Sequence, residues 1–235
     1  MTVLSRKSDK VLTLGIPKVD DVFPGFQRGD LAVLFGHPIC KTLLFCLCVR
    51  CQLPPRKGGL SSRAVYIDGG NTFDPYGVSS IAREYGLEPR SVLEKILVSR
   101  AFTVYQLIAL IFEKLEETLK QYRSRLVIVS DIIGLFLDKD VPKKEGRDLF
   151  MKMMRYLSEL ASNRQVIVVA SYFPRGYFSR SLFFDAVLFG RAKVVVSLKK
   201  SKDVLKFILE HHPNIRPFAV DFPSNSATMD MFMET

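Results

Sequence analysis

Residues 34–45, LFGHPICKTLLF, carry the side chains with the clearest chemical potential in this sequence. An apolar run ends at Gly36, and Lys41 and Thr42 open a second apolar run. A glycine turn followed by Lys-Thr at the start of a helix is typical of loops that bind phosphate groups. In such loops backbone amides face the phosphate oxygens, the lysine neutralises their charge and the hydroxyl holds Mg²⁺.

The loop departs from the usual pattern GxxxxGK[ST] in two ways. Only Ile39 and Cys40 separate Pro38 from Lys41, so the loop is one residue short. Cys40 also stands where the second glycine belongs, and its Cβ disfavours the positive φ angles that glycine adopts freely. We therefore expect Gly36, Lys41 and Thr42 to be the remnant of a phosphate loop that binds ATP and Mg²⁺ weakly or not at all. Retention of a single anion by Lys41 and Thr42 is the alternative.

A second candidate position ends the apolar run RLVIVSD, residues 125–131. A carboxylate at the end of such a strand commonly orients Mg²⁺. Here Ser130 occupies that position and Asp131 follows it. Because side chains alternate between the faces of a strand, a shift of one residue turns the Asp131 carboxylate away from the site unless a bulge returns it. No metal site is expected from these residues.

Four cysteines lie close together in the sequence: Cys40, Cys46, Cys48 and Cys51. They allow two interpretations. A zinc site would need them to converge, but at about 100° per residue the last three do not share one face of a helix. We therefore interpret them as reduced thiols in the core of the helix that follows the loop.

Composition indicates one soluble globular domain over 1–235, with a flexible N-terminus at 1–10 and a C-terminal tail at 224–235. The first ten residues lack the features of a secretory signal, and no apolar run is long enough to span a membrane, so we expect a cytoplasmic protein. The net charge of +10 suggests an anionic partner such as nucleic acid, although a basic solvated surface is the alternative.

The apolar patterns predict strands at 31–36, 64–69, 96–101, 125–131 and 165–171. Helical patterns separate them, including an amphipathic helix over about 103–122 and another over 148–161. Continuous Val/Ile/Leu runs are typical of parallel strands covered on both faces. Near the C-terminus AVLFG, AKVVVSLKK, DVLKFILEHH and PFAVDF follow one another without a predicted helix, which favours an antiparallel extension.

The order of these pieces resembles the core domain of the RecA/RadA recombinase and KaiC-like superfamily. TLGIPKVDDVFPGFQRGDLAVLFG, YIDGGNTFDPYGVSSIAREYGL, SRAFTVYQLIALI, RLVIVSDIIGLFL and SLKKSKDVLKFILEHHP match successive family motifs over most of the chain. The resemblance implies an α/β RecA-like three-layer fold with a mainly parallel central sheet and a C-terminal antiparallel extension. The separate N-terminal helical domain and the Phe-x-x-Ala motif of the recombinases are absent from this sequence.

Aligned with the recombinase motifs, the sequence also lacks the general base and the polar sensor. Gly70 stands where their glutamate activates water, and Tyr172 stands near the sensor glutamine. Loop length, magnesium carboxylate, base and sensor differ together, and their joint change predicts lost ATP hydrolysis. Asp68 matches a family aspartate, but a locally bonded strand-end carboxylate is its favoured role.

The resemblance further implies two DNA-contacting loops, one at 137–148 and one at 171–184. The first carries Lys143 and Lys144 among mixed charges. The second interleaves arginines with aromatic rings, as single-strand binders do, and its candidates are Arg175, Arg180, Tyr177 and Phe178. Solvated arginines with core aromatics are the alternative. A basic turn is formed by Lys199, Lys200 and Lys202. It could contribute cations to a neighbouring subunit, and an ordinary solvated turn is the alternative.

These features predict a catalytically inactive RecA-like paralogue that binds DNA, single-stranded in particular, or an active RecA-family partner in recombination and repair. Two alternatives stay open. One is a divergent ATPase whose site a partner subunit completes. The other is a KaiC-like structural or regulatory oligomer.

Overall fold

A computed structural model describes residues 11–173, 181–202 and 204–223. Its centre is an eight-stranded sheet in the order β10-β9-β8-β3-β7-β6-β4-β5. Pairing is parallel from β8 through β5 and antiparallel between β8, β9 and β10. The predicted mainly parallel sheet with an antiparallel extension is therefore confirmed.

The strands follow the apolar runs of the sequence closely. Their bounds are β3 Leu31–Gly36, β4 Ala64–Asp68, β5 Ile96–Arg100, β6 Leu126–Ser130, β7 Ile167–Tyr172, β8 Val194–Ser201, β9 Val204–His211 and β10 Phe218–Pro223. A separate two-stranded sheet pairs β1 Val11–Leu12 with β2 Phe26–Gln27, and the short helix α2 Pro17–Asp20 lies between them in the chain.

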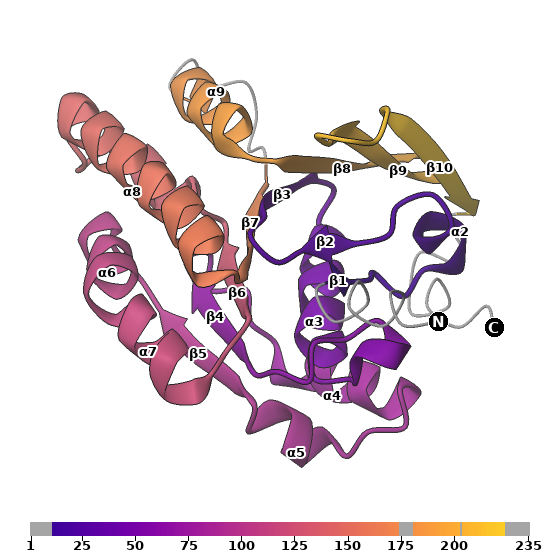
Figure 1. Cartoon of the computed structure of the whole chain (residues 1–235). Helices are drawn as coiled ribbons and strands as arrows, with labels where there is room; N and C mark the ends of the chain where they lie inside the picture. Colours follow the sequence, from indigo (N-terminus) through magenta and orange to yellow (C-terminus); the bar gives the residue numbers. More distant parts are fainter. Residues whose placement is uncertain (1–10, 174–180, 203, 224–235) are drawn as a thin grey trace.

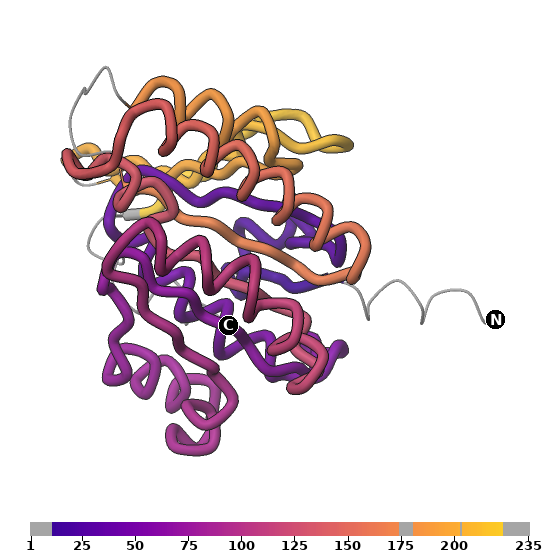
Figure 2. Tube along the Cα trace, turned by 90° about the vertical axis from the view of Figure 1, so that its left-hand side faces the viewer, coloured from indigo at the N-terminus to yellow at the C-terminus, as the bar shows by residue number. Residues whose placement is uncertain are grey.

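Helices cover both faces of the sheet and enclose two apolar cores (Figure 1). One face carries α3 Cys40–Arg50, α4 Pro75–Glu84 and α5 Pro89–Leu93. The other carries α6 Val104–Ala109, a π-helical turn at Leu110–Lys114, α7 Leu115–Tyr122, α8 Lys143–Arg164 and α9 Ser181–Arg191. In Figure 2, α8 lies alongside the helix formed by α6 and α7, and the Phe112 and Tyr156 rings meet between them at 5.0 Å.

All four cysteines are buried in the α3 core and none forms a disulfide. Cys40, Cys46 and Cys48 belong to α3, and Cys51 caps its C-terminus. Burial raises the pKa of Cys40 to about 12 and raises the pKa of the other three thiols as well. The predicted place of these thiols in the core is confirmed, and burial disfavours the thiolate form.

Two elements differ from the sequence-based expectation. AVLFG lies inside the helix α9 rather than in a strand, and its buried Leu188 stands four residues after the buried Phe184. Helix α8 begins at Lys143 rather than near Asp148, so Lys143 and Lys144 lie in its first turn and not in a loop. The part of the chain described here contains no helix long and apolar enough to cross a membrane.

Candidate functional site

The predicted phosphate loop connects β3 to α3 at the carboxyl end of the parallel strands. Gly36 has φ +106°, and a Cβ at this position would lie 2.3 Å from the carbonyl oxygen of Leu198 in β8. The next amide, of His37, donates to the same oxygen at 2.8 Å. The close approach of β8 therefore requires glycine and fixes the first residues of the loop.

The backbone amides of the loop bond to acceptors inside the loop itself. Ile39 N–H donates to Nδ1 of His37 at 3.3 Å, Cys40 N–H to the His37 carbonyl at 3.0 Å and Lys41 N–H to the Pro38 carbonyl at 3.0 Å. The His37 amide donates to Leu198, as described above, and Pro38 has no amide hydrogen. Every amide N–H of residues 37–41 therefore has an acceptor within the chain. The loop is a tight turn that enters α3 directly.

Nδ1 of His37 accepts the Ile39 amide, and the surroundings of the imidazole favour its neutral form. Burial lowers the pKa of His37, and the positive charge of Lys200 lowers it further. The tip of the β8–β9 hairpin therefore lies near the loop of its own chain. Of the three lysines predicted there, Lys199 pairs with Glu210 at 3.5 Å, whereas Lys200 and Lys202 are exposed.

Lys41 and Thr42 are half-buried in the first turn of α3. The Lys41 ammonium lies 5.8 Å from the centre of the Phe45 ring. The two residues that would contact phosphate in a working loop are thus present at a helix N-terminus, next to amides that already have acceptors.

At the end of β6, Ser130 is fully buried and its hydroxyl donates to Oδ1 of Asp68 in β4 at 2.8 Å. Asp68 also accepts the amides of Thr72 and Phe73, each at 2.9 Å. Burial by itself would raise the pKa of Asp68, but these amides and the Ser130 and Thr72 hydroxyls together hold it below its ordinary value. Asp68 therefore acts as a buried anion that anchors the chain after β4.

Asp131 follows Ser130 with φ +49°, outside the strand, and the β4–β6 register has no bulge. It is 1% exposed, and its amide donates to the hydroxyl of Ser171 in β7 at 3.1 Å. Sequence reasoning did not single out Ser171, because a serine ending an apolar strand carries no distinctive signal.

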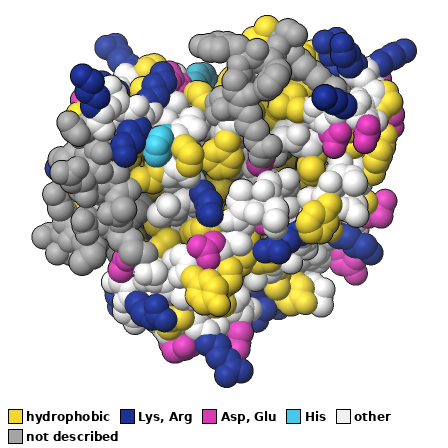
Figure 3. Space-filling view, turned by 180° about the vertical axis from the view of Figure 1, so that it is seen from behind, with side chains coloured by type: hydrophobic (Ala, Val, Ile, Leu, Met, Phe, Trp, Pro, Cys, Tyr) yellow, Lys and Arg dark blue, Asp and Glu magenta, His cyan; other side chains and the backbone are white. Residues whose placement is uncertain are grey.

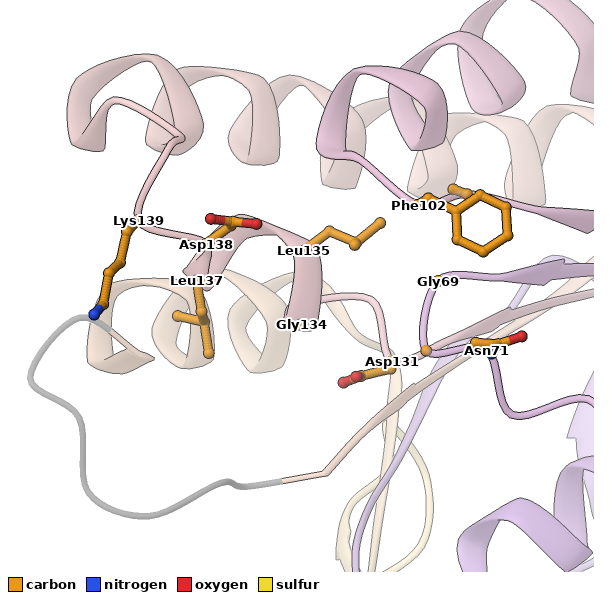
Figure 4. Close-up of a pocket in the computed structure, with 11 residues that line it drawn as sticks. Gly69, Asn71, Phe102, Asp131, Gly134, Leu135, Leu137, Asp138 and Lys139 are labelled. Atoms are coloured by element: carbon orange, nitrogen blue, oxygen red, sulfur yellow. The ribbon is translucent and has the colours of Figure 1, made fainter.

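Asp131 lines a cavity of about 680 Å³ at the ends of β4, β5 and β6 (Figure 4). Its walls include Gly70, Ala101 and a 3-10 helix at Gly134–Leu137, and Leu135 extends towards Phe102. The apolar residues around this cavity pack with the core of α6–α9, whereas the phosphate loop leads into α3 on the opposite face. The Asp131 carboxylate and Lys41 thus belong to different sides of the sheet.

Gly70, which stands in the position of the recombinase base, offers no room for a larger residue. A Cβ there would lie 2.8 Å from the Cβ of Asp131. Tyr172 is buried at the end of β7, and burial raises its pKa, with the negative charge of Asp185 adding to the effect. Among the described residues, no three His, Cys, Asp or Glu side chains are grouped to hold a metal ion.

The predicted DNA-contacting residues divide into two sets. Lys143 and Lys144 are exposed in the first turn of α8. The other four are Arg175, Tyr177, Phe178 and Arg180, and they lie outside the described residues. The N-terminal segment 1–10 and the C-terminal tail lie outside them as well. On the face seen from behind, basic side chains are spread among apolar ones rather than gathered in one patch (Figure 3).

Comparison with known proteins places these features in a family. The family model described as Rad51 matches residues 5–173. The meiotic recombination protein DMC1 homolog of Arabidopsis thaliana is 32% identical over 176 residues, covering 72% of this chain and 50% of that protein. The DNA repair and recombination protein RadA of Metallosphaera sedula is 30% identical over 168 residues, covering 70% of this chain and 52% of that protein.

The DNA repair protein RAD51 of Saccharomyces cerevisiae is 29% identical over 177 residues, covering 71% of this chain and 43% of that protein. The chain therefore spans about half the length of the curated relatives it matches. The matched region begins before β1 and ends just after β7, so it contains the phosphate loop, Asp68 and Asp131. With its RecA-like fold and this extended match, the chain belongs to the Rad51 family.

Proposed function

We propose that this protein acts in DNA recombination and repair without hydrolysing ATP, as an accessory that binds DNA or an active recombinase. The printed names of its relatives refer to meiotic recombination and to DNA repair. Its own residues support a role in which the family fold is kept for binding and the phosphoryl-transfer chemistry is lost.

The observation that carries the proposal is the orientation of the amides in the phosphate loop. A loop that binds a triphosphate presents successive N–H groups to the phosphate oxygens. Here the amides of His37, Ile39, Cys40 and Lys41 donate to Leu198, His37 and Pro38 instead. Binding ATP would require these bonds to break, and each costs about 1 kcal/mol net. The residues of this loop therefore do not fit Mg-ATP.

The magnesium side of the site gives independent support. Ser130 occupies the strand-end position, and its hydroxyl is held by Asp68 at 2.8 Å. Asp131 lies in a cavity whose apolar walls belong to the opposite face of the sheet from α3. A serine therefore stands where the metal carboxylate is expected, and the neighbouring Asp68 carboxylate is already engaged by Ser130 and by the amides of Thr72 and Phe73.

Calorimetry with Mg-ATP and an assay of phosphate release test the proposal. We expect Kd in the millimolar range or no binding, no hydrolysis, and no change in Lys41→Ala. Micromolar binding that Lys41→Ala abolishes would contradict the proposal. Binding that appears only after a recombinase is added would instead favour an ATPase completed by a partner subunit.

The DNA part of the proposal has its own test, a titration of single-stranded DNA at several salt concentrations. Each phosphate contact should contribute roughly 0.7 log units of affinity per log unit of salt. We expect Lys143→Ala combined with Lys144→Ala to weaken binding and to reduce this slope. Lys152→Ala, an exposed lysine further along α8, is the matched control. Absence of binding at low salt would remove DNA from the proposed partners.

A further inference from the structure

A second cavity lies at the amino end of the parallel strands, far from the phosphate loop. Its volume is about 310 Å³, at the lower end of the range of small-molecule sites. It is bordered by residues just before β4, β5 and β6 and by the end of α3. The phosphate loop and the Asp131 cavity follow the carboxyl ends of these strands, so this pocket is a separate place on the molecule.

A basic residue immediately precedes each of three adjacent strands, β4, β5 and β6. The register pairs Ala64 with both Ile96 and Leu126, so the preceding residues, Arg63, Lys95 and Arg125, are neighbours across the sheet. Adjacent strands are about 4.8 Å apart, and like charges at matched positions repel each other. Arg63 and Lys95 line the pocket, and Arg123 at the end of α7 adds a third cation to its wall.

The wall of this pocket contains no acidic residue. Within the described part of the chain, none of Arg63, Lys95 and Arg123 forms an ion pair. The Arg63 guanidinium lies 5.5 Å from the centre of the Tyr122 ring, which orients it beside the opening. Ser61, exposed and with φ +47°, adds a hydroxyl to the wall.

Gln52 closes the end of the pocket next to α3. Its Nε2 donates to the carbonyls of Cys48 and Val92, each at 3.1 Å, which fixes the orientation of the amide. Its Oε1 is buried and accepts no hydrogen bond from the described residues. A buried acceptor without a donor costs about 1–3 kcal/mol. Because this oxygen is shut off from solvent, Gln52 contributes its position at the wall of the pocket and not a ligand contact.

We propose that the pocket bordered by Arg63, Lys95 and Arg123 binds a phosphate group. Three cations converge on the pocket without a counter-ion, and the neighbouring hydroxyls add neutral donors. A tetrahedral oxyanion offers acceptors to all of them and relieves the repulsion among the cations. Because the pocket is independent of the loop between β3 and α3, phosphate binding here does not depend on the proposed loss of ATP hydrolysis.

Arg123 allows a test that separates binding from folding. It adopts φ +50° at the C-cap of α7, a conformation that glycine accepts without strain. Arg123→Gly therefore removes a cation while easing the backbone, and the full-length variant should stay folded. Lys95→Ala removes a second, exposed cation. Lys152→Ala on α8 loses the same charge away from the pocket and is the control.

The measurement is inorganic phosphate binding by ³¹P line broadening and by the phosphate-dependent shift in Tm, with chloride at equal ionic strength as reference. We expect saturable binding by the wild type and Lys152→Ala, and at least about tenfold weaker binding by Arg123→Gly combined with Lys95→Ala. Undiminished binding in the double variant would overturn the proposal. Equal effects of chloride and phosphate on the wild type would overturn it as well.

Competition identifies the source of the phosphate group. A short single-stranded oligonucleotide without terminal phosphate should displace inorganic phosphate if the site takes the nucleic-acid backbone. Displacement only by the 5′-phosphorylated form would indicate a phosphate monoester. Either result supports the proposed phosphate site if the variant with both Arg123→Gly and Lys95→Ala no longer binds the displacing oligonucleotide. Oligonucleotide binding that the double variant retains, with no phosphate binding by the wild type, would contradict it.

Discussion

At the level of single residues, the end of β6 is held by a hydrogen bond between two buried side chains. The hydroxyl of Ser130 donates to Asp68, which also accepts two backbone amides. Because the pKa of folded Asp68 lies below its ordinary value of 3.8, its contribution to stability is complete above that pH and is lost as the pH falls through the folded pKa.

Replacing Ser130 by aspartate should therefore destabilise the protein instead of restoring activity. The Ser130 hydroxyl lies 2.8 Å from Asp68, so an aspartate at position 130 would place a second buried carboxylate beside it. We therefore expect Ser130→Asp to lower the free energy of unfolding at pH 7 by about 2 kcal/mol or more. The pair should bind a proton with a raised pKa, so the loss should shrink on acidification. Urea denaturation at pH 7 and pH 5 measures both effects.

Ser130→Asn, a neutral side chain of similar size to aspartate, is the control for this substitution. It should be less destabilising than Ser130→Asp at pH 7 and show no recovery at pH 5. Equal stability of the two variants at pH 7 would contradict the like-charge explanation.

The sequence located these residues but did not specify their bonds. The strand pattern places Ser130 at the strand end and Asp131 one residue later. The sequence also favours a locally bonded strand-end carboxylate at Asp68, as the structure has it. The acceptor role of the His37 imidazole and the support of Asp131 by Ser171 depend on contacts between separate strands and a turn. Such contacts have no periodic pattern in a sequence.

At the level of elements, α8 begins with an electrostatic arrangement that does not favour the helix. Lys143 and Lys144 occupy its first turn, and the N-cap residue Pro142 makes no side-chain cap. Cations at a helix N-terminus interact unfavourably with the positive end of the helix dipole. Helix stability therefore does not explain these two lysines, and this strengthens their candidacy for binding an anionic partner.

Reversing both charges should change stability and DNA binding in opposite directions. We expect Lys143→Glu combined with Lys144→Glu to stabilise α8 by about 0.3–1 kcal/mol per residue while weakening DNA binding. Thermal unfolding and a DNA titration provide the two measurements. Lys152→Glu, in the middle of α8, should lack the stabilisation. A variant that is both more stable and binds DNA as tightly as the wild type would exclude these lysines from the DNA contact.

The same helix shows why some boundaries could not be predicted. Asp148 has the chemistry of an N-cap, so it was a reasonable start, whereas the observed start after Pro142 has no capping side chain. The α9 error has a different cause. AVLFG is too short to distinguish a period of 3.6 from a buried strand.

On the scale of the whole molecule, apolar layers on both faces of one sheet hold the fold together. The sequence predicted this arrangement because the central strands are apolar on both faces. All four thiols lie in the layer around α3. Their reactivity should therefore report the opening of the entire domain rather than of a local segment.

We expect no reaction of the native protein with a thiol reagent and reaction of four thiols after denaturation. Burial and raised pKa values both suppress the reactive thiolate. The labelling rate in low urea should follow the free energy of global unfolding. Lys152→Cys, which adds an exposed thiol, should react at once and serves as the positive control. Rapid labelling of any wild-type thiol would show that the α3 layer opens independently.

The close approach of Gly36 to Leu198 also bears on the geometry of the loop. With the His37 amide already held by β8, replacing Cys40 by glycine would leave the inward-facing bonds in place. Lengthening the loop would require an inserted residue together with a displacement of the β8–β9 hairpin, because the Leu198 carbonyl occupies the space beside Gly36. Substitution at Cys40 alone supplies neither change, so two segments far apart in the sequence set the geometry of this turn together.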